Sequence, residues 1–278
     1  MSYRSKSALP ILLLALFISL PAQAQDTKEV SESIKLSGEG RVVIDTYKGS
    51  IDIATWDRET VEIEALIEAD KDEYLVEYTE VRIHKSGKTL RIESDYERAK
   101  KAGKRGLFGN KSMSLPYVHY RIRMPHTADL QIDDYKSTIE INDLAADLDL
   151  ETYKGEVEID DVAGEVRIDT YKGRVELTNL AGSLEADTYK GYINAEFIAF
   201  NGNSAVDTYR GTVELVLPKS AGFDLNADMG KKGDLDSDFD LDDVRVVDKN
   251  RYRGEVGGGG PDLDIDTYRG EVTLAVMR

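Results

Sequence analysis

The chain of 278 residues contains no cysteine, one tryptophan, three histidines and six prolines. Without cysteine the protein forms no disulfide and carries no lipid on a cysteine at a signal cleavage site, so burial and backbone pairing must stabilise it. His84, His119 and His126 lack the spacing of metal ligands, and neither a nucleophile elbow nor a phosphate-cradling loop is present. These absences predict a protein that is not an enzyme and that holds neither a cofactor nor a metal.

Cations are scarce relative to acids, because 36 lysines and arginines stand against 53 aspartates and glutamates, which gives a net charge of −17. This balance argues against nucleic acid as a partner, since binding it depends on clustered lysine and arginine. High charge can also indicate disorder, but the 41% of apolar residues are arranged in alternation, which is typical of a folded chain.

No hydrophobic run near the N-terminus is long enough to span a membrane. The run from Leu9 to Leu20 is about a dozen residues, whereas a helix needs about 20 to cross a bilayer. It follows two cations and precedes the small-residue triplet Ala22-Gln23-Ala24, the pattern of a cleaved secretory signal peptide. We therefore predict a signal peptide over residues 1–24, export through the Sec pathway to the periplasm or cell surface, and no transmembrane span in the mature chain.

One pentapeptide, close to Asp-Thr-Tyr-Lys/Arg-Gly, recurs along the chain. Its copies occupy residues 45–49, 133–137, 151–155, 169–173, 187–191, 207–211 and 266–270. Tyr135, Tyr153, Tyr171 and Tyr189 follow one another at intervals of 18 residues, and Tyr209 follows after 20. A fixed period of this kind indicates a repeat architecture.

Each period holds two short strands and two turns. Residues 155–160 alternate polar and apolar, residues 161–164 are a turn, and residues 166–169 alternate again. We predict an all-β fold, a parallel β-helix-like β-solenoid of roughly 18-residue coils in which corresponding residues stack. Glycine at the end of each pentapeptide then supplies the positive φ or the close approach that a corner needs, and residues 200–203 bulge from one corner.

The region before the repeat is less regular. Alternation persists in residues 33–68, and residues 81–83 and 90–92 flank a predicted hairpin turn at residues 86–88. We predict three parts: the signal peptide of residues 1–24, an N-terminal β region of residues 25–125 that caps or opens the solenoid, and a solenoid repeat region of residues 126–278.

Five further segments, two of which begin at a pentapeptide glycine, carry a resemblance to a known family: Gly49–Ile53, Trp56–Arg58 with Val61–Ile63, Arg121–Pro125, Val213–Pro218 and Gly270–Leu274. On these segments the mature chain resembles the DUF4097-type putative adhesin family, β-strand-repeat proteins exported by bacteria. The resemblance implies a solenoid, export and no known enzymatic activity, and it carries over no binding residues. Where that family has a looser Thr-x-x-Gly corner, this chain has a nearly uniform pentapeptide.

Alternation places the threonine of each pentapeptide inside the solenoid and its acid and tyrosine outside. Stacked coils then align the tyrosines as an external ladder between an acidic column (Asp133, Glu151, Asp169, Asp187, Asp207) and a basic column. An elongated ligand could lie on this face, with aromatic faces against sugar rings or extended peptide and charges supplying hydrogen bonds. The candidate ligand-binding residues are Tyr135, Tyr153, Tyr171, Tyr189, Tyr209, Lys154, Lys172, Lys190 and Arg210. The alternative is structural: the rings stack, and the two charged columns offset each other's like-charge repulsion.

Residues 98–111 form a glycine-containing run with six cations and no acid in an otherwise acidic chain. As a surface-anchoring loop, its cations would meet lipid phosphates while an aromatic residue dips into the surface. The candidate anchoring residues are Lys100, Lys101, Lys104, Arg105 and Phe108. The alternative is a solvated loop that folds back on the acidic body.

Two further segments invite a ligand but have simpler interpretations. The acidic residues of 234–243 suggest calcium, yet their spacing matches neither an EF-hand nor a glycine-rich calcium-binding roll, so a strand with a solvated face is the prediction. Residues 257–260 are four consecutive glycines, interpreted as a flexible connector.

Together these patterns predict a non-enzymatic, exported cell-envelope protein, an adhesin or scaffold that binds an elongated ligand through its outer repeat face. The partner is open: a cell-envelope glycan or an envelope protein. The first alternative is an envelope sensor or assembly factor that binds a partner protein by adding a strand at an exposed solenoid end. The second is a carbohydrate-active enzyme with paired carboxylates, although carboxylates are too abundant to nominate a pair.

Overall fold

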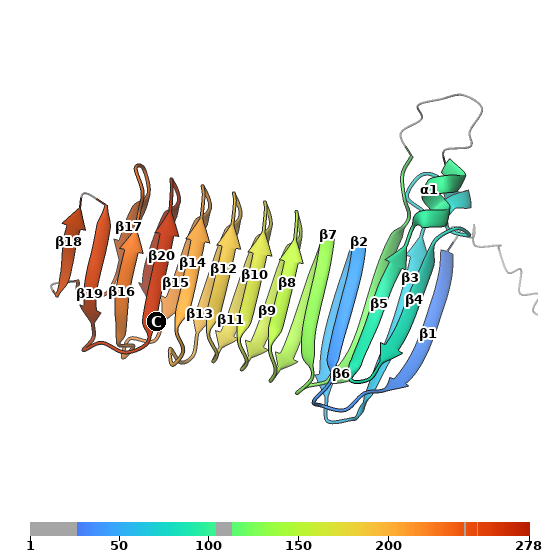
Figure 1. Ribbon diagram of the computed structural model, residues 1–278, viewed down its shortest axis with the longest axis horizontal. Helices are drawn as coiled ribbons and strands as arrows, with labels where there is room; N and C mark the ends of the chain where they lie inside the picture. The colour runs from blue at the N-terminus through green and yellow to red at the C-terminus, as the bar shows by residue number, and fades with distance from the viewer. Residues whose placement is uncertain (1–26, 104–112, 242, 249) are drawn as a thin grey trace, which may run out of the picture.

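The computed structural model describes residues 27–103, 113–241, 243–248 and 250–278. Strands stack into an elongated solenoid with two facing layers, as Figure 1 shows. Neighbouring coils pair in parallel and in register, so that Val166, for example, lies between Leu148 and Leu184. The predicted all-β solenoid is confirmed. The predicted signal peptide lies outside the described residues, and the division at residue 125 stays a prediction.

Two long strands, β2 (Arg41–Trp56) and β7 (Asp129–Leu144), run through both layers, and every later coil gives one strand to each layer. In spatial order, the first layer contains β4 (Glu80–Ser86), β5 (Thr89–Asp95), the first halves of β2 and β7, β8 (Leu148–Thr152), β10 (Val166–Thr170), β12 (Leu184–Thr188), β14 (Ser204–Thr208), β20 (Asp262–Thr267), β16 (Phe223–Asp228), β19 (Arg251–Val256) and β18 (Val244–Asp248).

The second layer contains, in the same direction, β1 (Thr27–Lys35), β3 (Thr60–Glu68), β6 (Tyr117–Pro125), the second halves of β2 and β7, β9 (Glu156–Val162), β11 (Arg174–Leu180), β13 (Tyr192–Phe197), β15 (Thr212–Leu217), β21 (Glu271–Val276) and β17 (Asp234–Ser237). A short helix, α1 (Glu97–Gly103), and one 3-10 turn, η1 (Glu73–Leu75), lie at the N-terminal end of the stack (Figure 1). Neither described helix has the length or hydrophobicity needed to cross a bilayer.

The core lies between the two layers. Alternation sends one side chain of each pair inward, so residues such as Val157, Ile159 and Ile168 are buried in a single hydrophobic cluster that runs the length of the stack. The pentapeptide threonines are inside as predicted, with Thr170 only 1% exposed. The predicted hairpin is also present, since β4 and β5 pair antiparallel with Ser86 opposite Thr89.

The corner opposite the pentapeptide depends on residues that the sequence interpretation did not single out. Asp143, Asp161 and Asn179, spaced by 18 residues, have φ of 60°, 59° and 57°. Aspartate and asparagine tolerate this left-handed conformation better than other residues with a side chain. In the coils of β7, β9 and β11, one such residue therefore bends the second-layer strand toward the next turn.

The last coil in the sequence is not the last coil in space. Strand β20 pairs with β14 on one side and β16 on the other, and β21 likewise lies between β15 and β17. In Figure 1 the C-terminus accordingly lies within the stack, while β18 and β19 form its far end. Residues 218–222 therefore carry the chain from β15 across the width of one whole coil to β16.

Candidate functional site

The tyrosines of all seven pentapeptide copies form one continuous stack at a corner of the solenoid. This tyrosine ladder consists of Tyr47, Tyr135, Tyr153, Tyr171, Tyr189, Tyr209 and Tyr268. Successive ring centroids are 4.7 to 5.1 Å apart, and successive ring planes differ by 2° to 9°. The ring spacing follows from the roughly 4.8 Å separation of paired strands, because each coil contributes one ring. Tyr96 closes one end with an edge-on contact to Tyr47 at 6.0 Å.

A threonine–glycine contact builds the corner in the last five copies. The threonine Oγ1 accepts a hydrogen bond from the glycine N–H three residues later, at 2.6 to 3.0 Å, as between Thr188 and Gly191. A Cβ on Gly191 would lie 2.7 Å from the carbonyl oxygen of Gly173 and closer still to Thr188 Oγ1. The glycines of these five copies are not among the positive-φ residues, so of the two reasons predicted for them, close approach is the one that applies.

Stacking leaves the ring edges, not the ring faces, on the surface of the ladder. Tyr47, Tyr135 and Tyr268 are 38%, 39% and 38% exposed, and the other ladder tyrosines are half-buried. A sugar ring therefore has no aromatic face to contact along the ladder, because each face is covered by the next tyrosine. The accessible groups are phenol edges and hydroxyls, which donate and accept hydrogen bonds.

A column of cations follows the ladder, one per coil. The charged groups of Lys154, Lys172, Lys190, Arg210 and Arg269 lie 5.1 to 5.2 Å from the ring centroid of the preceding tyrosine. All five side chains are exposed. Among the described residues, none of the five forms an ion pair with a carboxylate.

The acidic column lies in register on the outer face of the first layer, with Asp169 between Glu151 and Asp187. Like charges one strand apart repel. The charge on Asp133 raises the pKa of Glu151, and burial followed by the charges on Asp207 and Asp169 raises the pKa of Asp187.

Burial, and then the neighbouring Asp266, likewise raises the pKa of Asp207. No cation of the column that follows the ladder is among the charges that shift these three pKa values. The cations of the ridge, meaning the tyrosine ladder together with its cation column, therefore keep their charge available to an external anion.

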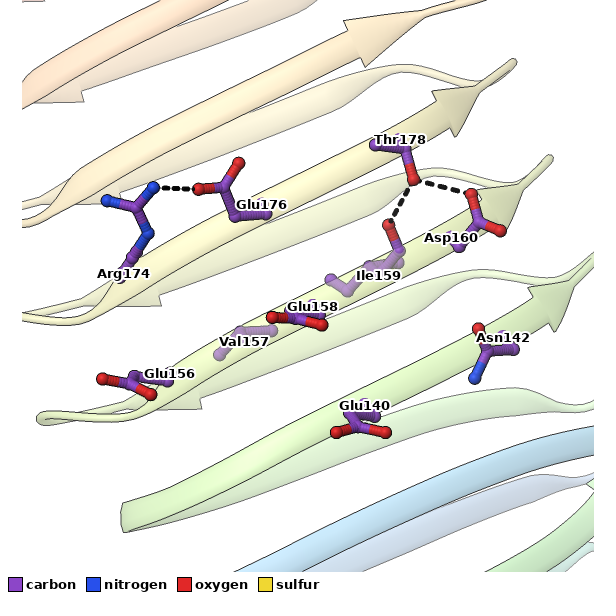
Figure 2. Close-up of a pocket in the computed structure, with 10 residues that line it drawn as sticks. All are labelled: Glu140, Asn142, Glu156, Val157, Glu158, Ile159, Asp160, Arg174, Glu176 and Thr178. Carbon is purple, nitrogen blue, oxygen red and sulfur yellow. Dashed lines mark hydrogen bonds and ion pairs between the residues drawn. The ribbon is translucent and has the colours of Figure 1, made fainter.

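A shallow hollow on the outer face of the second layer is acidic and internally bonded. Figure 2 shows it along β7, β9 and β11, with Glu140, Glu156 and Glu158 on its floor. Arg174 pairs with Glu176, and Thr178 donates a 2.6 Å hydrogen bond to Asp160, whose pKa it lowers. No group of three or more potential metal ligands occurs in the part of the chain that the structure describes.

The segment around 234–243 forms a strand over Asp234–Ser237 and continues without regular secondary structure through residue 241. Strand β17 places Leu235 against the core, and Phe239 follows it there. Asp238 accepts a 3.2 Å hydrogen bond from the backbone N–H of Val276, so this carboxylate serves the backbone of the neighbouring strand.

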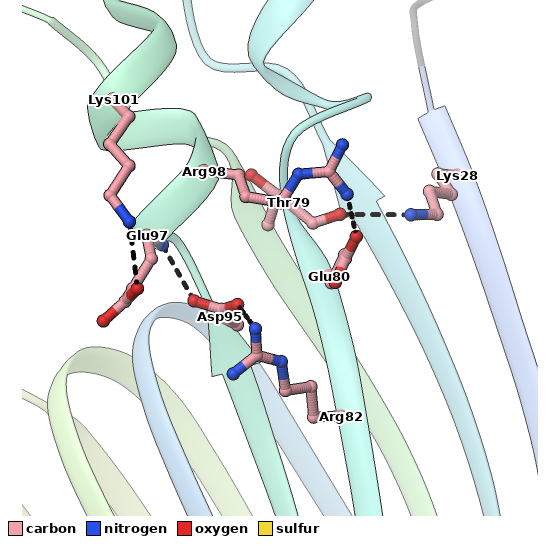
Figure 3. Close-up of polar contacts among 8 residues, drawn as sticks. All are labelled: Lys28, Thr79, Glu80, Arg82, Asp95, Glu97, Arg98 and Lys101. Carbon is pink, nitrogen blue, oxygen red and sulfur yellow. Dashed lines mark hydrogen bonds and ion pairs between the residues drawn. The ribbon is translucent and has the colours of Figure 1, made fainter. Parts of the chain in front are cut away.

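Two of the five predicted surface-anchoring residues are described. Lys100 and Lys101 are exposed on α1, whereas Lys104, Arg105 and Phe108 lie outside the described residues. Figure 3 shows that Lys101 pairs with Glu97 at 3.4 Å and that Arg98 pairs with Glu80. Nearby, Asp95 accepts a 2.8 Å hydrogen bond from the Glu97 N–H and pairs with Arg82. Two described cations of this run, Arg98 and Lys101, thus form ion pairs with acidic residues of the protein itself.

The structure brings together one polar trio that sequence spacing did not reveal. Ser50 and His119 lie 2.9 Å apart (Oγ to Nδ1), and His119 Nε2 is 3.6 Å from a carboxylate oxygen of Glu68. The trio sits on paired strands β2, β6 and β3, and β2 is paired on both sides here. Its backbone N–H groups are therefore committed to the sheet and offer no oxyanion hole, so the set lacks what an acyl-transfer site requires.

A family model described as Toastrack DUF4097 matches residues 40–275. No curated protein matches the chain in sequence. Among solved structures, a putative cell adhesion protein from Clostridium sporogenes is 14% identical with a TM-score of 0.38, covering 90% of this chain and 100% of its own.

Two further structures are similar to the chain. A putative adhesin from Bacteroides fragilis is 11% identical with a TM-score of 0.34, covering 90% of this chain and 97% of its own. A putative lipid binding protein from Parabacteroides distasonis is 12% identical with a TM-score of 0.34, covering 88% of this chain and 96% of its own.

Proposed function

This chain belongs to the Toastrack DUF4097 family, and we propose that it is a non-enzymatic, exported, adhesin-like protein that binds an elongated anionic glycan of the cell envelope along its ridge. The ridge residues proposed to contact the ligand are Tyr135, Tyr153, Tyr171, Tyr189, Tyr209, Lys154, Lys172, Lys190 and Arg210.

The supporting observation is the un-neutralised cation column. In a chain of net charge −17, five cations stand in a row without ion-pair partners among the described residues, while nearby acids repel one another instead of pairing with them. Cations at the regular spacing of paired strands fit a ligand that repeats its negative charges along a line. An acidic polysaccharide or the phosphorylated sugars of lipopolysaccharide have this chemistry.

The tyrosines contribute through their edges. Phenol hydroxyls beside each cation can hydrogen-bond sugar hydroxyls, and stacking holds every ring in one orientation before the ligand arrives. Binding by many weak, aligned contacts gives avidity that grows with ligand length.

Co-sedimentation of the mature protein with purified peptidoglycan and with lipopolysaccharide tests the proposal. The variant Lys154→Gln/Lys172→Gln/Lys190→Gln removes three neighbouring charges of the column. The matched control, Lys85→Gln/Lys88→Gln/Lys219→Gln, removes three exposed lysines elsewhere. We expect the ridge variant to lose binding, the control to keep it, and added salt to weaken the wild-type interaction.

Replacing Tyr153, Tyr171 and Tyr189 by Phe removes the hydroxyls without removing the rings. Weaker glycan binding by this variant would assign a contact to the hydroxyls, and Ala at the same positions tests the rings themselves. Equal sedimentation of the wild type and the lysine variant would contradict the proposal. Release of reducing sugar from the glycan would contradict the non-enzymatic assignment.

A second candidate function is assembly with a partner protein by strand addition. Its supporting observation is β18, which pairs only with β19 among the described strands and exposes Val246 and Val247 at 63% and 66%. Unpaired apolar strand edges are templates for another chain. A photo-cross-linking residue at position 246 should give a discrete adduct in producing cells, whereas one at position 85 on the charged β4 edge should not.

A further inference from the structure

The coil formed by β20 and β21 fills a slot between two coils that precede it in the sequence. On one side it meets β14 and β15, and on the other β16 and β17. No pairing joins β14 to β16 or β15 to β17 among the described strands. Withdrawing this coil would therefore leave a gap one coil wide, lined by unpaired strand edges in both layers.

The contacts in the slot are extensive. Leu263, Ile265, Val272 and Leu274 are at most 2% exposed, and Tyr268 continues the ladder at 5.1 Å from Tyr209. The Glu271 N–H donates to Gly211 O, and the Asp234 N–H donates to Gly270 O, both at 3.1 Å. Burial, ladder stacking and backbone pairing thus all stabilise the inserted coil in the slot.

The far side of the slot has supports of its own. Strand β16 keeps an antiparallel partner, β19, whether or not β20 is present. The Phe223 ring on β16 lies 5.8 Å from the Phe200 ring, centroid to centroid, and Phe200 belongs to the connection between β13 and β14. The phenylalanine contact reaches past the inserted coil, and the two contacts together hold β16 near its place.

The connection into the inserted coil consists of glycines. From β19 the chain crosses the end of β16 through Gly257, Gly258 and Gly259, whose φ values are +62°, +92° and +76°. A Cβ on Gly258 would meet nothing within 4 Å, so the connection is open at its middle, although Gly257 and Gly260 lie close to the backbone of residues 221–222. Glycine alone moves freely among such conformations, so this segment can act as a hinge.

We propose that residues 261–278 exchange between two copies of this chain, each copy's last coil filling the other's slot to give a strand-exchanged dimer. Every contact made within one chain is remade between two, so only the hinge conformation and the association entropy distinguish the dimer from the monomer. The balance should therefore shift toward the dimer as protein concentration rises. This inference does not depend on what the ridge binds.

Because the chain has no cysteine, single engineered thiols test the exchange directly. Ala205 on β14 and Asp264 on β20 are register partners, half-buried and exposed respectively. Ala205→Cys and Asp264→Cys chains are mixed, refolded together over a range of concentrations, and oxidised mildly. We expect a disulfide-linked heterodimer whose yield rises with concentration.

The matched control mixes Glu185→Cys and Ala205→Cys chains, since these positions are register partners on β12 and β14 in the body of the stack. It should give several times less heterodimer, because exchange at that junction would require a far larger part of the solenoid to open. Equal yields from the two mixtures at every concentration would overturn the proposal.

Thermal unfolding of each single-cysteine chain verifies its fold, and the unmodified chain supplies an independent measurement. After concentrated refolding and dilution, a strand-exchanged dimer should revert to monomer only slowly in size-exclusion chromatography, because reversion requires the coil to leave its slot. A wild-type chain that stays monomeric at all concentrations would also overturn the proposal.

Discussion

The first two copies of the pentapeptide have a different place in the solenoid from the last five, although all seven contribute a tyrosine to the ladder. Residues 45–49 and 133–137 lie inside the continuous strands β2 and β7, whereas the later copies form corners between two separate strands. Thr46 does not serve its own glycine but shares a 2.9 Å hydrogen bond with Ser94, which in turn bonds Tyr120 at 2.6 Å. The ladder nevertheless runs through Tyr47 and Tyr135 without a break.

The second copy has a third set of interior hydrogen bonds. Asp134 replaces the threonine, and one carboxylate accepts hydrogen bonds from the Ser137 N–H, the Ser137 hydroxyl and the Thr152 hydroxyl at 2.6 to 3.0 Å. Interior chemistry therefore varies with the local corner while the outer ring is kept. The tyrosine stack is therefore compatible with more than one interior arrangement.

The largest expected effect concerns the close packing of the glycine in the last five copies, compared with a glycine in an open turn. Gly191→Val in a body corner would press its side chain into the Gly173 carbonyl and Thr188, and should lower the free energy of unfolding by about 3 kcal/mol. The added Cβ of Gly87→Ala in the β4–β5 turn meets no atom within 4 Å. This variant should lose only about 1 kcal/mol of unfolding free energy, because an alanine at the φ of +59° is strained. Urea unfolding compares them; equal losses would refute the close-approach explanation.

A smaller effect compares the hydrogen bonds of the threonine in a late copy and in the first copy. Thr188→Val keeps the shape but leaves the buried Gly191 N–H without its acceptor, which should cost about 2 kcal/mol. Thr46→Val should cost about 1 kcal/mol, because Ser94 retains its bond to Tyr120. The same unfolding measurement applies, and a larger loss at Thr46 than at Thr188 would contradict the assignment of distinct roles.

The smallest effect concerns pH. Burial raises the pKa of Asp134 above its unfolded value of about 4, so the folded protein binds this proton more tightly. Its stabilising contribution is present below the unfolded pKa and is lost as pH rises through the folded pKa. Asp134→Thr/Ser137→Gly, which converts this copy to the body form, should therefore lose less stability than the wild type between pH 4 and neutrality.

Thermal unfolding across that pH range gives the comparison. Glu77→Gln, an exposed site with the same charge change, is the control and should follow the wild type. The raised pKa values of Asp187 and Asp207 contribute in the same direction as that of Asp134, and this contribution is common to the wild type and the variants. A double variant with the full wild-type dependence would contradict the prediction.

Much of the body could be predicted from the sequence because each coil repeats its neighbour. Alternation around Val157 and Ile168 defined the inside, and the 18-residue interval aligned the tyrosines. The interval alone could not show that the rings cover one another's faces, since that depends on side-chain direction at the corner. Ser50, His119 and Glu68 escaped detection because strand pairing, not sequence distance, brings them together.

The order of the last coils could not be read from the repeat. Residues 266–270 match the pentapeptide as well as any copy, but a match says only that a coil stacks, not which coil it stacks on. Here the intervening hairpin of β18 and β19 gives β16 another partner, which allows β20 to enter from the side.

The inserted coil also determines the order in which the coils fold. Coils up to β15 can be laid down one after another as the chain emerges, each on a finished neighbour. Strands β16 and β17 have no strand to pair with in the stack on arrival, because β20 and β21, which join them to it, have yet to follow. Residues 223–276 should therefore become ordered in one late cooperative step, after a pause in which the growing solenoid ends at β14 and β15.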